Sequence, residues 1–148
     1  MATTKKRKKR SPLLILQDKI WKKFSVYIRC RDANYQGYCV CITCGKVAPW
    51  KEMDAGHWLH GKFPGTWLNP KNVHAQCPQC NKYKDGARDI YAIRLEAKYG
   101  FGILQELEDS KHKSAQTWRM DTLREAEKEV DRLSSTSFAS LPVHEGCP

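Results

Sequence analysis

Apolar residues recur at intervals of three and four near the start of the chain, which predicts an amphipathic helix over residues 12–31. The side chains that share its apolar face are Leu13, Leu16, Ile20, Phe24 and Tyr27. Ser11 and Pro12 suit the N-cap and the first helical position, because a hydroxyl accepts a hydrogen bond from a free amide and proline has no amide proton to satisfy. The apolar face is expected to form part of the core.

The same periodicity returns in the second half of the chain. It predicts a helix over residues 89–99 that stops at Gly100, a short helix around residues 103–107, and a third helix capped by Asp121. The third helix carries a stripe with coiled-coil spacing, formed by Leu123, Ala126, Val130 and Leu133. This stripe is compatible with a homodimer and equally with packing onto the same chain. The pattern ends at residue 133.

Between these helices the apolar runs are short and alternate with turn residues, which is typical of strands. A strand is expected over residues 38–41, followed by a hairpin with residues 47–50 on one side and residues 53–59 on the other. Residues 72–76 are expected to be extended, and residues 81–84 to begin a helical turn. Helices that flank a group of short strands predict an α+β fold.

Two C-x-x-C pairs stand on either side of the predicted hairpin. Two residues between cysteines allow a tight turn to direct both sulfur atoms at one point, and two such turns supply the four thiolates of a structural Zn²⁺ site. The predicted ligands are Cys41, Cys44, Cys77 and Cys80. Cys39 points to the same side of its strand as Cys41 and is expected to be a buried thiol. Cys30 and Cys147 have no partners at metal-binding spacing and are expected to be unpaired.

The charge of the chain favours a polyanionic partner, most simply DNA. The 148 residues include 26 Lys and Arg against 16 Asp and Glu, for a net charge of +10. A basic stretch without apolar periodicity is expected to form a disordered arm that contacts phosphates, and its residues are Lys5, Lys6, Arg7, Lys8, Lys9 and Arg10. Nuclear localisation and a solubilising tail are the alternatives for this arm. The sequence contains no run of about 18 apolar residues, so no membrane-spanning helix is expected.

These patterns divide the chain into five parts. They are a basic arm (1–10), an N-terminal helix and turn (11–37), a zinc-bound core (38–86), C-terminal helices (87–133) and a flexible tail (134–148). The seven cysteines are odd in number and no signal peptide is recognisable, which favours a reducing, cytoplasmic compartment over a disulfide framework.

Polar residues near the cysteines suggest phosphodiester hydrolysis. This reaction needs a base to deprotonate water and a divalent cation to neutralise the phosphate and the departing oxygen. His57 is the candidate base, and Asp54 and Asn81 offer the oxygen atoms that suit Mg²⁺ or Mn²⁺. Asn72 is expected to hydrogen-bond across the hairpin and hold His57. His60 is a weaker candidate for contact with DNA.

The segments CITCG, MDAGHW, NPKNVHAQC and CPQCNKYKDG together resemble the HNH, or ββα-metal, nuclease motif. Over roughly residues 13–133 the chain resembles more closely the NinG (Rap) recombination nucleases of lambdoid phages. The shared features are the C-I-x-C-G turn, D-A-G-H, N-x-H-x-Q-C, C-N-x-x-K after the last cysteine, and I-R-x-R-D at residues 28–32. His74 belongs to this motif, although simple packing on a strand is an alternative for it.

The resemblance implies a zinc-stapled ββα-metal core and a structure-selective DNA endonuclease that acts on branched DNA such as Holliday junctions and displacement loops. It implies that His57 is catalytic, that Asn72 is the middle Asn of the motif, and that Asn81 binds the catalytic metal. If the chain is encoded by a phage, it acts in the cytoplasm of the bacterial host. The expected phosphate contacts beside the site are Lys82, Lys84 and Arg88.

One residue departs from the wider HNH pattern, which usually has an acidic residue directly before the catalytic histidine. Gly56 occupies that position, and the nearest carboxylate is Asp54. The alternative function is a non-catalytic, zinc-containing DNA-binding protein that assists recombination.

Overall fold

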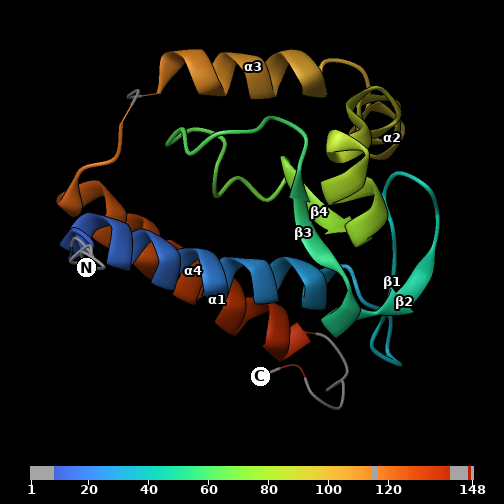
Figure 1. Cartoon of the computed structure of the whole chain (residues 1–148), viewed down its shortest axis with the longest axis horizontal. Helices are drawn as coiled ribbons and strands as arrows, with labels where there is room; N and C mark the ends of the chain where they lie inside the picture. The colour runs from blue at the N-terminus through green and yellow to red at the C-terminus, as the bar shows by residue number, and fades with distance from the viewer. Residues whose placement is uncertain (1–8, 115–116, 141–146, 148) are drawn as a thin grey trace, which may run out of the picture.

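The computed structural model describes residues 9–114, 117–140 and 147 (Figure 1). Helices α1 and α4 lie side by side on one side of the strands, while α2 and α3 lie on the other side (Figure 1). The helices are α1 (Pro12–Arg31), α2 (Arg88–Tyr99), α3 (Ile103–Lys113) and α4 (Met120–Ser140). The strands are β1 (Tyr38–Val40), β2 (Val47–Pro49), β3 (Asp54–His57) and β4 (Val73–Gln76). The predicted α+β class is confirmed.

Helix α1 begins where the sequence predicts. The Ser11 hydroxyl accepts a hydrogen bond from the Leu14 amide at 3.3 Å, which satisfies one of the free amides of the first turn. Ile20 and Phe24 on its apolar face are fully buried. The N-terminal arm lies outside the described residues except for Lys9 and Arg10, which are exposed.

Helix α4 uses its apolar stripe within the same chain. Leu123 and Val130 are buried in one cluster with Ile20 and Phe24 of α1. At the edge of this contact, Lys23 Nζ lies 2.8 Å from Asp131 Oδ1. The stripe that suggested a homodimer is therefore covered by α1.

Two predictions about α4 are wrong in detail. The helix continues to Ser140, so the first residues of the expected tail are helical, while residues 141–146 and 148 lie outside the described residues. Asp121 lies within the first turn instead of capping it, and its carboxylate accepts a hydrogen bond from the Thr122 amide at 2.8 Å.

The strands pair in an arrangement that differs from the predicted hairpin. β1 pairs antiparallel with β2, and β3 pairs antiparallel with β4, so residues 47–50 and 53–59 belong to different ribbons. The short 3₁₀ turn η1 (Trp50–Glu52) separates them. Trp50 is buried in this turn. The predicted hairpin at residues 47–59 is wrong because its two sides pair with β1 and β4 and not with each other.

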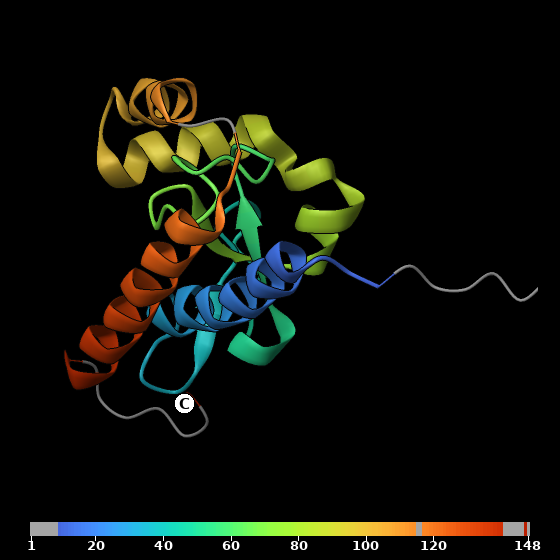
Figure 2. The same cartoon turned by 90° about the vertical axis from the view of Figure 1, so that its left-hand side faces the viewer.

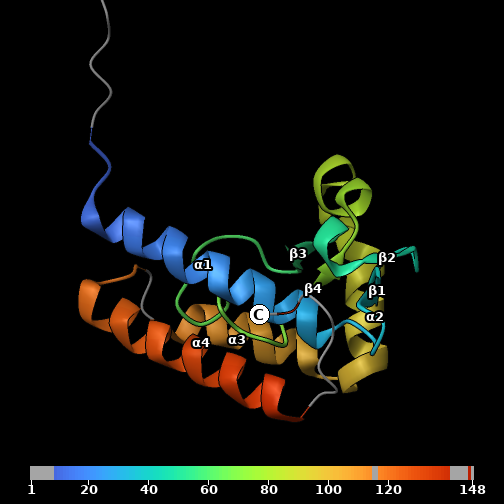
Figure 3. The same ribbon diagram turned by 90° about the horizontal axis from the view of Figure 1, so that it is seen from below.

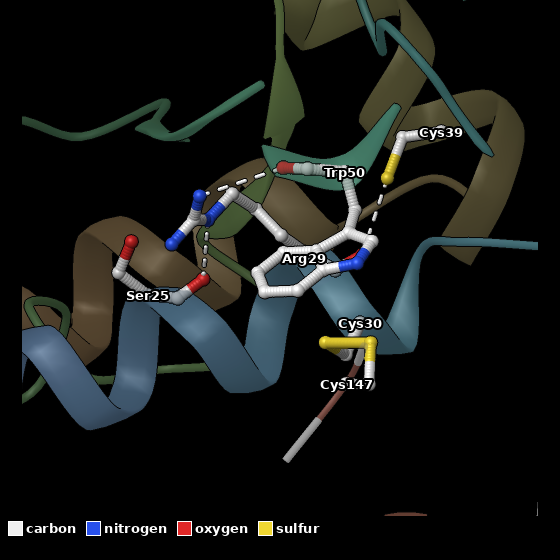
Figure 4. The surroundings of a disulfide bond; sticks show 6 residues. All are labelled: Ser25, Arg29, Cys30, Cys39, Trp50 and Cys147. Carbon is white, nitrogen blue, oxygen red and sulfur yellow. Dashed lines mark hydrogen bonds between the residues drawn. A yellow bond between two sulfur atoms is a disulfide. The ribbon is translucent and has the colours of Figure 1, made fainter. Parts of the chain in front are cut away.

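Cys30 and Cys147 form a disulfide (Figure 4), so the prediction that both are unpaired is wrong. Their Cα atoms are 6.1 Å apart, although the residues are separated by 117 positions in the sequence. No local spacing signals such a pair, because its geometry depends on the whole fold. Cys39 is a buried thiol as predicted, and its sulfur lies 3.1 Å from the carbonyl oxygen of Arg29 (Figure 4).

None of the helices in the described residues combines the length and the apolar character that a membrane crossing requires.

Candidate functional site

The four predicted zinc ligands converge on one point. The sulfur atoms of the C-x-x-C pairs Cys41/Cys44 and Cys77/Cys80 all lie within 4.8 Å of one another. A tetrahedral zinc site with bonds of about 2.3 Å places its sulfur atoms about 3.8 Å apart, and Cys44 Sγ lies 3.7 Å from Cys77 Sγ. The cluster therefore fits a metal ion such as Zn²⁺.

The electrostatics of the cluster also fit a cation. Burial opposes ionisation of Cys41, but amide hydrogen bonds from Cys44 and Cys77 outweigh it and lower the pKa of Cys41 to about 6. Burial raises the pKa of Cys77 to about 12, with the neighbouring cysteines adding to the effect. Four thiols so close together cannot all ionise unless a positive charge lies between them. A bound divalent metal would supply that charge.

The cluster joins the two ribbons. The Cys41 amide donates to the Lys46 carbonyl at 2.8 Å, which forms the first turn, and the Ile42 amide donates to Ala75 of β4 at 3.0 Å. The second cysteine pair leads into the π-helical turn η2 (Gln79–Tyr83), as the sequence predicts for a helical turn after Cys80. A metal bound by the four cysteines would join the turn between β1 and β2 to the end of β4 and the start of η2.

His57 ends β3 and faces a cavity of about 400 Å³. Its Nε2 lies 2.8 Å from the Trp67 carbonyl oxygen, and its ring stacks on Trp21 with centroids 4.9 Å apart and planes at 22°. A carbonyl oxygen only accepts, so Nε2 carries the proton and Nδ1 has the free lone pair. Burial lowers the pKa of His57, which keeps the ring neutral near pH 7.

Asn72 hydrogen-bonds across the two strands as predicted, but its side chain bonds to Leu59 and Thr66 and not to His57 itself. It is fully buried, and its Oδ1 accepts from the Leu59 amide at 2.8 Å. Its Nδ2 donates to the carbonyls of Leu59 and Thr66, each at 3.0 Å. These bonds fix the loop that presents the Trp67 carbonyl. Asn72 therefore supports the loop that follows β3.

Asn81 of η2 lines the same cavity as His57. Its Nδ2 donates to Asp54 Oδ2 at 3.0 Å, and Lys82 Nζ lies 3.4 Å from the same oxygen. Asp54 is not among the residues that line the cavity. The structure therefore brings His57 and Asn81 together and places Asp54 behind Asn81.

Four residues that line this cavity were not candidates in the sequence: Asp18 and Trp21 from α1, and Lys62 and Trp67 from the loop after β3. His60, the weaker candidate for contact with DNA, lines the cavity as well. The α1 residues appear in the sequence only as parts of an amphipathic helix, and nothing local indicates which turn of that helix meets β3. Lys62 Nζ lies 5.3 Å from the Trp67 ring centroid, which places a cation at the mouth of the cavity.

Gly56 is required by close packing. A Cβ atom at this position would overlap Gln76 Oε1 and lie 2.9 Å from Gln76 Cβ. Gln76 is fully buried, and its Nε2 donates to the Gly86 carbonyl at 2.7 Å. The side chain of Gln76 thus fills the space that an acidic residue before His57 would need.

His74 packs within the core, in agreement with the simpler of its two interpretations. Its two ring nitrogens lie 3.1 Å and 2.8 Å from the hydroxyls of Tyr91 and Tyr99. Burial, aided by the nearby Arg31, lowers the pKa of His74 to about 3. Tyr91 in turn donates to the Gly56 carbonyl at 2.8 Å, so this network supports β3.

The predicted phosphate contacts Lys82, Lys84 and Arg88 are all exposed on η2 and the residues that follow it. Arg10, at the start of the described chain, forms an ion pair with Asp18 at the cavity. Lys5, Lys6, Arg7 and Lys8 lie outside the described residues.

Comparison with known proteins supports the resemblance to the NinG family. The family described as Bacteriophage Lambda NinG protein matches residues 1–135. The protein ninG of Salmonella phage P22 is 34% identical over 90 residues, which cover 60% of this chain and 41% of that protein. The protein ninG of Escherichia phage lambda is 31% identical over 87 residues, which cover 58% and 40% of the two chains.

The aligned part spans about two fifths of the length of these relatives. No solved structure gives a significant match. Because the family match covers most of the sequence, including all four cluster cysteines, the chain belongs to the NinG family.

Proposed function

We propose that this chain is a metal-dependent endonuclease of the HNH, or ββα-metal, type that hydrolyses phosphodiesters in branched recombination DNA such as Holliday junctions and displacement loops. The observation that supports it best is the convergence of His57, from β3, and Asn81, from η2, on one cavity beside the four-cysteine cluster. The order β3, β4, η2 supports the proposal, because a ββα-metal core consists of two antiparallel strands followed by a helix, and η2 is a helical turn in the position of that helix.

In this proposal His57 is the general base. Nδ1 takes a proton from the attacking water, while Nε2 keeps its bond to the Trp67 carbonyl. That carbonyl stabilises the imidazolium as it forms, and the stacked Trp21 ring prevents the imidazole from rotating. Asn72 is the positioning residue, because it fixes the loop that carries the carbonyl.

Asn81 and Asp54 are the proposed ligands for a catalytic Mg²⁺ or Mn²⁺. Both offer oxygen atoms, and Asn81 Nδ2 is already used by Asp54, so Asn81 Oδ1 is the atom left for a cation. A divalent cation bound there supplies neutralisation of the phosphate and of the leaving oxygen. Lys82 lies close enough to contribute a further positive charge.

The exposed basic residues support DNA as the substrate. Residues 9–11 lead away from the body of the protein on the same side as the turns at residues 79–87 (Figures 2 and 3). Lys9 and Arg10 of the first segment, and Lys82 and Lys84 of the second, are exposed. A DNA strand laid along this side would contact both groups of cations and pass the cavity.

One observation favours the alternative, a zinc-containing DNA-binding protein without catalysis. Asp54 is already neutralised by Lys82 and hydrogen-bonded by Asn81, which is also how a purely structural carboxylate is satisfied.

Cleavage of a synthetic four-way junction with Mg²⁺ or Mn²⁺ separates the two functions. We expect His57→Ala to lower the cleavage rate about 100- to 10,000-fold and to leave junction binding without metal unchanged. His112→Ala is the matched control, because His112 is exposed on α3, where it pairs with Glu108 of the same helix, and it does not line the cavity. Equal cleavage by His57→Ala and the parent would remove His57 from the mechanism. Binding without cleavage of any DNA would establish the alternative.

A further inference from the structure

Tyr83 is a large aromatic side chain that is 78% exposed on the turn that carries Asn81. Exposure alone does not distinguish Tyr83, because Tyr35 and Phe101 are also exposed. The position of Tyr83 in the structure distinguishes it from them. Tyr83 is two residues from Asn81, which lines the cavity, and it stands between Lys82 and Lys84.

The backbone around Tyr83 is held rigidly at both ends. Before it, the Asn81 amide donates to the Cys77 carbonyl at 2.9 Å, within the cysteine cluster. After it, the Lys84 amide donates to Gln79 at 3.1 Å, and the Gly86 carbonyl is fixed by buried Gln76. An exposed ring on a fixed backbone loses little conformational entropy when it binds a flat ligand.

The residues directly after Tyr83 store backbone strain. Asp85 and Ala87 have φ values of 48° and 47°, in the left-handed region that non-glycine residues rarely adopt. Strain of this kind is concentrated at ligand-binding segments. The strained turn directs the chain back toward α2 and leaves Tyr83 at the outer edge.

The charged residues at positions 82–89 include both cations and carboxylates, so the Tyr83 ring is the distinctive feature of these residues. Lys82 is engaged by Asp54, and the carboxylates of Asp85 and Asp89 offset the cations of Lys84 and Arg88. The carboxylates therefore reduce the positive charge of residues 82–89 without removing it. These residues offer an aromatic face, with lysines close enough to keep a nucleic-acid strand in place.

We propose that Tyr83 is a stacking platform for an unpaired nucleobase of the DNA strand that enters the His57 and Asn81 cavity. The inference rests on the proposed function in taking DNA as the ligand. Only an unpaired or terminal base has a face free to stack on an exposed ring, since a base within a duplex is covered on both sides. Tyr83 thereby makes the protein favour DNA with unpaired bases over continuous duplex.

Binding of fluorescein-labelled oligonucleotides tests the inference without requiring cleavage. The probes are a single-stranded oligo-dT and a duplex of the same length, both at one fixed salt concentration. Tyr83→Ala is expected to weaken binding of the single strand about five- to 150-fold and to change duplex binding by no more than about twofold. Tyr83→Phe keeps the ring and is expected to bind as the parent does. Tyr35→Ala is the matched control, because Tyr35 is 70% exposed in the turn before β1.

Each outcome bears on the inference. Equal weakening on both probes, no weakening on either, or no binding of any DNA by the parent would overturn it. A Tyr83-dependent preference for the single strand, in a protein that cleaves no DNA, would support the inference and overturn the nuclease proposal. Cleavage of DNA by the parent, together with unchanged single-strand binding by Tyr83→Ala, would support the nuclease proposal and overturn the inference about Tyr83.

Discussion

Substitution of Gly56 by Ala is expected to destabilise the protein severely, although it adds only a methyl group. The φ angle of Gly56 is not in the left-handed region, so the backbone itself accepts alanine. The added Cβ would overlap Gln76 Oε1 and lie 2.9 Å from Gln76 Cβ. Either β3 moves away from β4, or the Gln76 side chain leaves its position.

The magnitude follows from what Gln76 would lose. Its Nε2 donates to the Gly86 carbonyl at 2.7 Å and to Thr43 Oγ1 at 3.3 Å, and all of this is buried. A buried polar group left unpaired costs about 1–3 kcal/mol, and an overpacked core costs about 1–3 kcal/mol. We therefore expect Gly56→Ala to lower the free energy of unfolding by about 3–5 kcal/mol, a large part of a typical domain's stability.

Urea unfolding of the zinc-loaded protein, followed by far-ultraviolet circular dichroism, measures this change. Gly102→Ala is the control, because a Cβ there meets nothing within 4 Å and only the φ of 97° opposes it. That control is expected to cost about 1–2 kcal/mol. In a Gln76→Ala background Gly56→Ala should cost less than in the parent, with a coupling energy of at least about 1 kcal/mol.

The packing argument would be refuted by two results together. The free energy of unfolding of Gly56→Ala would lie within about 0.5 kcal/mol of that of the parent, and the effects of Gly56→Ala and Gln76→Ala would be additive in the double variant. Gly56→Asp is subject to the same overlap. Restoring the acidic residue of the HNH pattern is therefore expected to unfold the protein and not to improve a metal site.

Three further predictions concern the metal, the base and the disulfide. Removing zinc with a chelator, or replacing Cys80 by Ser, is expected to abolish the folded near-ultraviolet circular dichroism signal; a chelated protein that keeps it would contradict a structural metal. The pKa of His57 is lowered below its ordinary 6.5, and protonation removes the base, so single-turnover cleavage should decline only below about pH 6.5. An acidic limb well above that pH would exclude His57 as the base. Cys147→Ser is expected to lower the free energy of unfolding by about 2–4 kcal/mol without reductant and to have no effect with dithiothreitol, and an equal effect in both would show that Cys30 is not paired.

The helices were predictable because their determinants are local. The Ser11 cap, the apolar face of α1 and the stop after Tyr99 all appear in the sequence and in the structure. The strands were located but wrongly paired. A strand of three or four residues has too few side chains to specify its partner, and β3 pairs with a strand that lies beyond the loop at residues 58–72.

The candidate site was predictable where spacing along the chain encodes it. The cysteine intervals predicted the cluster, and the motif placed His57 and Asn81 near it. Contacts that depend on tertiary packing were not predictable. The Trp67 carbonyl and the Trp21 ring that hold His57 come from a loop and a helix whose positions are set by the core.

The position of Asp54 follows from the same packing that requires Gly56. Successive residues of a strand point to opposite faces, so Asp54 and Gly56 share one face of β3 while His57 lies on the other. Gln76 pairs with Asp54 in the register of β3 and β4 and fills the space beside Gly56. A carboxylate on this face must then stand two residues earlier, about 7 Å along the strand, where Asp54 meets Asn81. If a catalytic cation binds this protein, its position is set by η2 and Asn81, and the residue before His57 has no part in it.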